Sequence, residues 1–153
     1  MLQEISGNAA RLLPALDQVD AKGWIAKGAS ETYLAQLDSS KQQARALADG
    51  AKALARNPEK LSVSLELFFR IEGLETMLGS LQEGIRRYQG AQAAQSLSEV
   101  YAEGGANRER FRSYIVNLAA EREQQFTVMD REAQRCRGTL MAPTPTKTTG
   151  RKK

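Results

Sequence analysis

Two consecutive heptad patterns, separated by a single sharp boundary, constrain this chain most strongly. The first spans about residues 31–56 and the second about residues 58–89, and both space their seam residues alternately four and three apart. Such spacing is typical of long helices that pack along one seam. The first seam contains Tyr33, Leu37, Ser40, Ala44, Leu47, Ala51 and Leu54, and the second contains Leu67, Ile71, Leu74, Leu78, Leu81, Ile85 and Tyr88.

The boundary at Asn57-Pro58 predicts that these helices form an antiparallel hairpin. Asparagine is a good helix N-cap and proline suits the first helical position, so the second helix is expected to begin at Pro58. The first seam is rich in small residues, whereas the second is uniformly large. Small side chains facing large ones allow two helices to interdigitate at close range.

The remaining patterns predict further helices and a tail. A first helix over residues 2–19 is expected to kink or break at Pro14, because proline removes a backbone donor and clashes with the preceding turn. A short helix is expected over 91–103 and a last long one over 107–137, ending at Gly138. Residues 1–137 therefore form one helical domain, and residues 138–153 are expected to be a disordered, basic, Pro/Thr-rich tail.

The last helix carries an apolar stripe that is predicted to face the core along its whole length. Its members recur about every 3.6 residues, which is typical of a core-directed helix face. They are Phe111, Ile115, Leu118, Arg122, Phe126, Met129, Ala133 and Cys136. Cys136 is thus predicted to be a small packing residue, with a reactive thiol as the alternative. Together these helices predict an all-α, elongated, up-and-down antiparallel bundle.

Composition excludes several classes of chemistry. The chain has no histidine and one cysteine among its 153 residues. A His-based catalytic site and the Glu-x-x-His motif of di-iron bundles therefore cannot be built, and a zinc site is not expected. Phosphate-binding and nucleophile-elbow glycine motifs are also missing from the sequence. We expect no enzyme activity, no metal and no cofactor.

Charge is distributed unevenly along the chain. All 18 acidic residues, and all but four of the 22 basic residues, precede Gly138. The net charge of +4 therefore belongs to Lys147, Arg151, Lys152 and Lys153 in the tail. Weak electrostatic contacts of this tail with nucleic acid are an alternative function, although a nucleic-acid-binding fold usually carries its basic surface on the domain itself.

A few residues of the body are candidate contact sites. Trp24, most simply a plug over one end of the bundle, and Tyr33 are candidate partner-binding residues in the loop region. Arg108 and Arg112 share a helix face and are candidates too, against the simpler interpretation of a solvated face. Arg122 is the one charged member of the stripe, and it is predicted either to pair with Glu72 or Glu75 across the bundle or to extend into solvent.

The chain resembles other proteins in three stretches, which are WIAKGASETY, PEKLSVSLELFFR and DREAQRCR. In these the chain resembles a group of uncharacterised helical proteins from environmental bacteria that look exported, over most of residues 8–137. The resemblance implies an all-helical fold and a place at the cell envelope, and it implies no activity. The chain is expected to be cytoplasmic if Met1 is the true start and exported if a signal peptide has been removed.

The leading functional hypothesis is therefore a non-enzymatic interaction or structural module. Its partner is expected to be a protein docked along a groove between helices or near the loops around Trp24. No apolar run in the sequence reaches membrane-spanning length. Heptad seams serve intramolecular bundles and intermolecular coiled coils alike, so a homo-oligomer formed through the helical seams is left open. A small-molecule carrier has no sequence signal for or against it.

Overall fold

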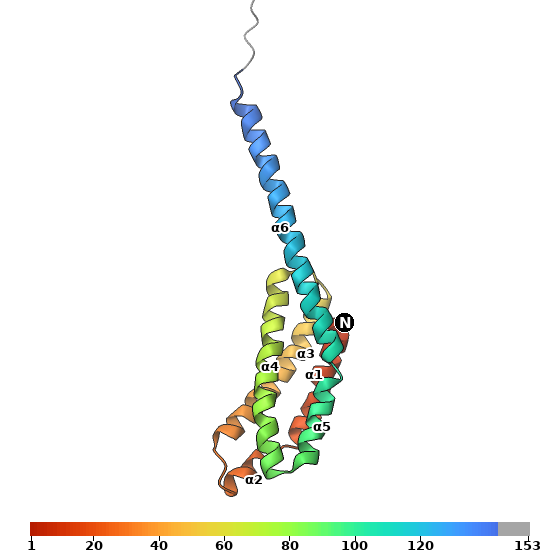
Figure 1. Cartoon of the computed structure of the whole chain (residues 1–153), viewed down its shortest axis with the longest axis vertical. Coiled ribbons are helices and arrows are strands. Elements are labelled where there is room, and N and C mark those ends of the chain that lie inside the picture. The colour runs from red at the N-terminus through yellow and green to blue at the C-terminus, as the bar shows by residue number, and fades with distance from the viewer. Residues whose placement is uncertain (144–153) are drawn as a thin grey trace, which may run out of the picture. The chain divides into compact units, whose positions relative to one another are not determined.

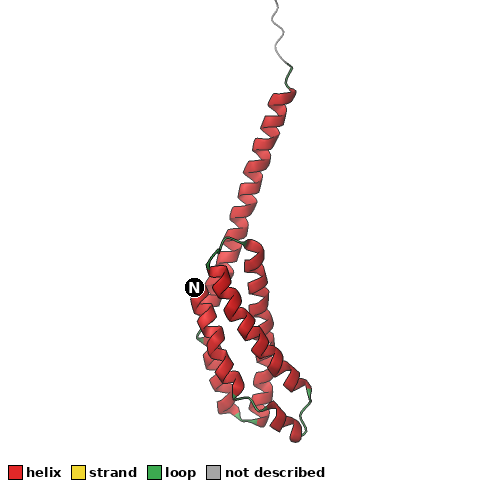
Figure 2. Cartoon of the chain, turned by 180° about the vertical axis from the view of Figure 1, so that it is seen from behind, coloured by secondary structure: helices red, strands yellow, loops and turns green. Residues whose placement is uncertain are grey.

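The protein is all-α, as the sequence predicts. A computed structural model describes residues 1–143, and every regular element among them is a helix (Figures 1 and 2). In chain order the helices are α1 (Leu2–Asp17), α2 (Ala21–Ala26), α3 (Thr32–Ala55), α4 (Leu61–Tyr88), α5 (Ala91–Ala102) and α6 (Gly105–Met141). The chain divides into two compact units, Met1–Leu118 and the part that begins at Ala119.

The first unit is an antiparallel bundle in which α1, α3, α4 and α5 lie side by side (Figure 1). The predicted hairpin of α3 and α4 is confirmed, because six residues of each seam are buried between the helices. Helix α1 packs against α3, and Ser6 Oγ donates a hydrogen bond of 2.8 Å to the Ala48 carbonyl oxygen. Asn8 Nδ2 donates to the Val100 carbonyl oxygen at 2.7 Å and ties α1 to α5. In both bonds the acceptor is a backbone carbonyl oxygen of a helix, which can accept a side-chain hydrogen bond because it has two lone pairs.

Trp24 closes the bundle near the α3–α4 hairpin's open end. It lies on α2, a helix of six residues where the sequence predicts only a connector. Asp20 caps this helix by accepting a hydrogen bond from the Gly23 backbone N–H at 2.9 Å. The indole packs edge-on against Tyr33, at 5.5 Å between ring centroids, and stacks on Tyr88 at 5.6 Å. A bundle-end plug, the simpler of the two interpretations of Trp24, agrees with its 1% exposure.

The predicted helix ends need three corrections. Helix α4 begins at Leu61 and not at Pro58, because the Asn57 backbone N–H bonds to the Leu54 carbonyl oxygen and so extends the end of α3. Helix α6 passes through Gly138 and ends at Met141. Helix α1 is bent but continuous through Pro14, so the alternative of a break there is wrong. The helix predicted over 91–103 is confirmed within one residue.

The largest correction concerns the apolar stripe of α6. Its first three members, Phe111, Ile115 and Leu118, are buried in the bundle as predicted. From Phe126 onward the stripe is exposed, and Cys136 is exposed with it. The prediction that this whole face is buried is therefore wrong beyond Leu118. Residues Phe126, Met129, Ala133, Cys136 and Leu140, which continue the stripe at four-three spacing, are called the distal stripe below.

Candidate functional site

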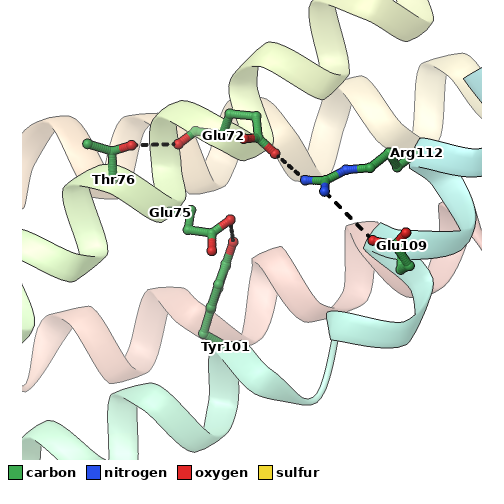
Figure 3. A network of polar contacts seen from close by, with 6 residues as sticks. All are labelled: Glu72, Glu75, Thr76, Tyr101, Glu109 and Arg112. Atoms are coloured by element: carbon green, nitrogen blue, oxygen red, sulfur yellow. Dashed lines mark hydrogen bonds and ion pairs between the residues drawn. The ribbon is translucent and has the colours of Figure 1, made fainter.

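Helices α4 and α6 line a polar groove in the first unit. Figure 3 shows the polar contacts at this place, which also include Tyr101 of α5. The groove has a volume of about 270 Å³. Its lining includes two of the predicted contact residues, Arg108 and Arg112, and both of the predicted acidic residues, Glu72 and Glu75. The sequence therefore identified residues that do come together, although it assigned them to two separate sites.

Arg112 is held by carboxylates from two helices. Its Nη2 donates to Glu72 Oε1 at 2.9 Å, and its Nη1 lies 3.9 Å from Glu109 Oε2, one turn earlier on α6. All three side chains are substantially exposed, so solvent weakens these attractions. The α4 carboxylate predicted to pair with an arginine of the last helix does so, but its partner is Arg112.

Arg108 lies between an aromatic ring and a buried amide. Its guanidinium carbon is 3.7 Å from the centroid of the Tyr101 ring, a cation–π contact. Its Nη1 donates to Asn8 Oδ1 at 3.2 Å, while Asn8 itself is buried. Gly104 allows this approach, because a Cβ at that position would collide with the Asn8 side chain. Arg108 thus joins α1, α5 and α6.

Tyr101 contacts Arg108 and Glu75 beside the groove and has a raised pKa. Burial of the phenol raises the pKa of Tyr101 to about 12, with the nearby Arg108 charge acting in the opposite direction and Glu75 reinforcing the rise. The phenol donates to Glu75 Oε2 at 3.4 Å (Figure 3). A phenol with this pKa keeps its proton at physiological pH, so it serves here as a hydrogen-bond donor.

The shift in Tyr101 predicts a loss of stability at alkaline pH. The unfolded phenol titrates near its ordinary value of 10.0, whereas the folded phenol titrates at about 12. The folded state therefore binds the proton more tightly, and this contribution to the free energy of unfolding is complete below pH 10 and is lost as pH rises toward 12. Ultraviolet absorbance titration of wild type minus Tyr101→Phe isolates this phenol. A difference curve with its midpoint near the ordinary value would contradict the burial argument.

The groove is best described as a polar junction between helices. Arg108, Arg112, Glu72 and Glu75 each bond to another side chain of the same bundle. Their partners lie on different helices, so the network links α1, α4, α5 and α6. This arrangement gives the groove a structural role that the sequence alone did not predict.

The other predicted contact residues are placed elsewhere. Trp24 is buried and Tyr33 is half-buried against it, so the two form an aromatic cluster inside the bundle. Arg122 Nη1 donates to Gln125 Oε1 at 2.9 Å on α6 itself. The carboxylates of Glu72 and Glu75, predicted as its partners, are bonded to Arg112 and Tyr101. Lys147, Arg151, Lys152 and Lys153 lie outside the described residues.

The distal stripe is the feature that the sequence analysis misjudged. Phe126 is 73% exposed, Met129 is 71% exposed and Leu140 is 86% exposed. Large apolar side chains scattered singly on a surface are ordinary, but these recur on one helix face over four turns. The four-three spacing of these residues is visible in the sequence, and the prediction is wrong in placing this face inside the bundle.

Comparison with known proteins gives no further guide to function. No family model, no curated protein and no solved structure matches this chain. Of the helices in residues 1–143, none combines the length and the apolar character that crossing a bilayer demands.

Proposed function

We propose that this protein is a non-enzymatic interaction module whose distal stripe docks against a partner helix. The exposure of Phe126, Met129 and Leu140 at heptad spacing carries the proposal. Knobs at this spacing fit the holes of a facing helix, which is the geometry of a coiled coil. The resemblance to proteins that look exported supports a further proposal, that the module works at the cell envelope.

The energetics of the distal stripe favour a bound state. Burying one Phe, Leu or Met side chain stabilises a complex by about 1.5–3 kcal/mol, so three such residues contribute roughly 4.5–9 kcal/mol before the entropic cost of association. Residues 126–141 are all exposed in this chain, so tertiary packing contributes little to this part of α6. Most helical stability in proteins comes from tertiary packing, and a partner would supply it here.

The polar junction supports the same proposal indirectly. It holds the first part of α6 on the bundle through Arg108 and Arg112, which bond to side chains of α1 and α4. Residues that fix the start of a helix reduce the conformational freedom that it loses when its later part binds. The junction therefore anchors the first part of α6 within the bundle.

Site-specific photo-crosslinking tests the docking face. A benzophenone amino acid replaces Phe126 in one variant and Gln124, on the opposite side of α6, in a matched control. Irradiation in cells of the source organism is expected to give a discrete adduct from position 126 and little or none from position 124. Equal adducts from both positions, or none from either, would mean that the distal stripe is not a docking face.

A further inference from the structure

We infer that the partner of the distal stripe is a second copy of this chain, aligned parallel to the first. The inference rests on the proposed docking function and adds the identity and direction of the partner. Its basis is the charge pattern that flanks the stripe. The charged side chains of this pattern belong to residues 123–137 of α6, all of which are exposed.

Heptad positions follow from the spacing of the stripe. Phe126, Ala133 and Leu140 occupy the a positions, and Met129 and Cys136 occupy the d positions. The flanking e positions are then Glu123, Asp130 and Arg137, and the flanking g positions are Gln125, Glu132 and Thr139. These flanks select the partner and its direction, because e and g side chains form the interhelical ion pairs of coiled coils.

A parallel pair of identical helices makes these flanks complementary. In that arrangement a g residue faces the e residue of the following heptad on the other helix. Glu132 then faces Arg137 of the second copy, and symmetry repeats the pair on the other side. Gln125 faces Asp130 in the same way, an amide beside a carboxylate. Each seam residue meets its own counterpart, so all five members of the distal stripe are buried.

The antiparallel alternative brings like charges together. When Phe126 is set against Cys136 and Met129 against Ala133, the e positions face each other and so do the g positions. Asp130 then meets Asp130 of the second copy, and Glu132 meets Glu132. Glu123 and Arg137 form two favourable pairs in this alignment by symmetry, and the two carboxylate pairs offset them, whereas the parallel alignment has two favourable pairs and no like-charge pair. Like charges across a helical interface are destabilising, so the parallel alignment is favoured.

The single chain leaves Glu132 available for this pairing. Its present partner is Arg135, one turn away on the same helix, at 3.5 Å between Arg135 Nη1 and Glu132 Oε1. Both side chains are well exposed, and a surface pair of this kind is weak. Exchanging Arg135 for Arg137 of the second copy therefore requires little rearrangement.

Charge reversal at the flanks tests the pairing on the full chain. Sedimentation equilibrium is expected to show a reversible dimer whose dissociation constant rises roughly tenfold in Glu132→Arg and in Arg137→Glu. The double variant Glu132→Arg/Arg137→Glu restores the ion pairs and is expected to return to within about threefold of wild type. Circular dichroism checks that each variant folds. A dissociation constant that is the same in wild type and in all three variants would overturn the parallel pairing.

Oxidation of Cys136 tests the direction independently. A parallel pair places the two Cys136 thiols in one layer, where diamide can oxidise them to a disulfide. The antiparallel pair sets Cys136 opposite Phe126, and ten residues at 1.5 Å separate the thiols by about 15 Å, beyond disulfide reach. The control Cys136→Ser/Gln134→Cys moves the thiol to the outer face. Rapid formation of a covalent dimer by wild type alone is expected, and equal rates in both would overturn the alignment.

The two proposals can fail separately. A chain that stays monomeric at high concentration, while position 126 crosslinks to a different protein, overturns the self-association and leaves the docking face intact. A monomer whose position 126 captures nothing overturns both proposals.

Discussion

Replacing Trp24 by alanine is expected to lower the free energy of unfolding by about 3–5 kcal/mol, the cost of truncating a large buried aromatic side chain. The indole is 1% exposed and contacts the rings of Tyr33 and Tyr88. The floor under it is closely fitted, because a Cβ on Gly84 would lie 2.8 Å from both the indole and the Tyr33 ring. Neighbouring side chains packed this tightly cannot collapse to fill the space that alanine leaves.

Trp24→Phe separates packing from polarity at this position. The indole Nε1 is buried and has no hydrogen-bond partner among residues 1–143. Phenylalanine removes that unsatisfied donor while keeping an aromatic ring, so it is expected to cost much less than alanine. Phe69→Ala is the matched surface control, since Phe69 is 66% exposed, and it is expected to change stability by about 0.5 kcal/mol or less.

Urea denaturation followed by circular dichroism measures these three variants without relying on Trp24 fluorescence. The free energy of unfolding should be lowest for Trp24→Ala, intermediate for Trp24→Phe and highest for Phe69→Ala. A Trp24→Ala variant as stable as Phe69→Ala would contradict the assignment of Trp24 as the plug of the bundle.

The bundle could be predicted from sequence because its signals are local and repeated. The seams of α3 and α4 each provide six buried residues at fixed spacing, so an error at one position does not change the result. Helix α2 was missed because Gly23 and Gly28 resemble helix stops. Gly23 instead lies inside the helix and donates its backbone N–H to the cap residue Asp20. A helix of only six residues is too short to show a periodic pattern in the sequence.

Pairing across helices was harder to predict than helix formation. Periodicity correctly placed Glu72 beside the last helix, but it could not distinguish Arg112 from Arg122, which lie ten residues apart. A close approach near the start of α6 is equally hidden in the sequence, since Gly104 leaves room for the Asn8 side chain that accepts from Arg108. Such a close approach is a property of three-dimensional packing that residue spacing does not encode.

The distal stripe exposes a general limit of periodicity. The same spacing describes Phe111, which is buried, and Phe126, which is 73% exposed. Heptad spacing predicts that another helix packs on a helix face, but it does not indicate whether that helix belongs to the same chain. The prediction that Cys136 is a core residue is wrong for this reason, because the part of the stripe that holds Cys136 is exposed.

Phe126→Ser/Met129→Ser is expected to abolish docking while leaving the bundle intact. Each copy in a dimer loses two apolar knobs of about 1.5–3 kcal/mol, so association weakens by roughly 6 kcal/mol or more, at least a ten-thousandfold change. Both side chains are more than two-thirds exposed in the single chain, so the stability of residues 1–118 should change little. Val128→Ser is the matched control, because Val128 is 51% exposed and lies off the stripe.

Hydrogen exchange of the α6 amides measures this result most directly. At a concentration where wild type is dimeric, residues 126–141 of wild type and of Val128→Ser should exchange slowly, since their helix is covered. The same amides of Phe126→Ser/Met129→Ser should exchange at rates close to those of an unprotected peptide, with residues 1–118 protected equally in all three proteins. Identical and fast exchange over residues 126–141 in all three would contradict the claim that a second copy covers the distal stripe.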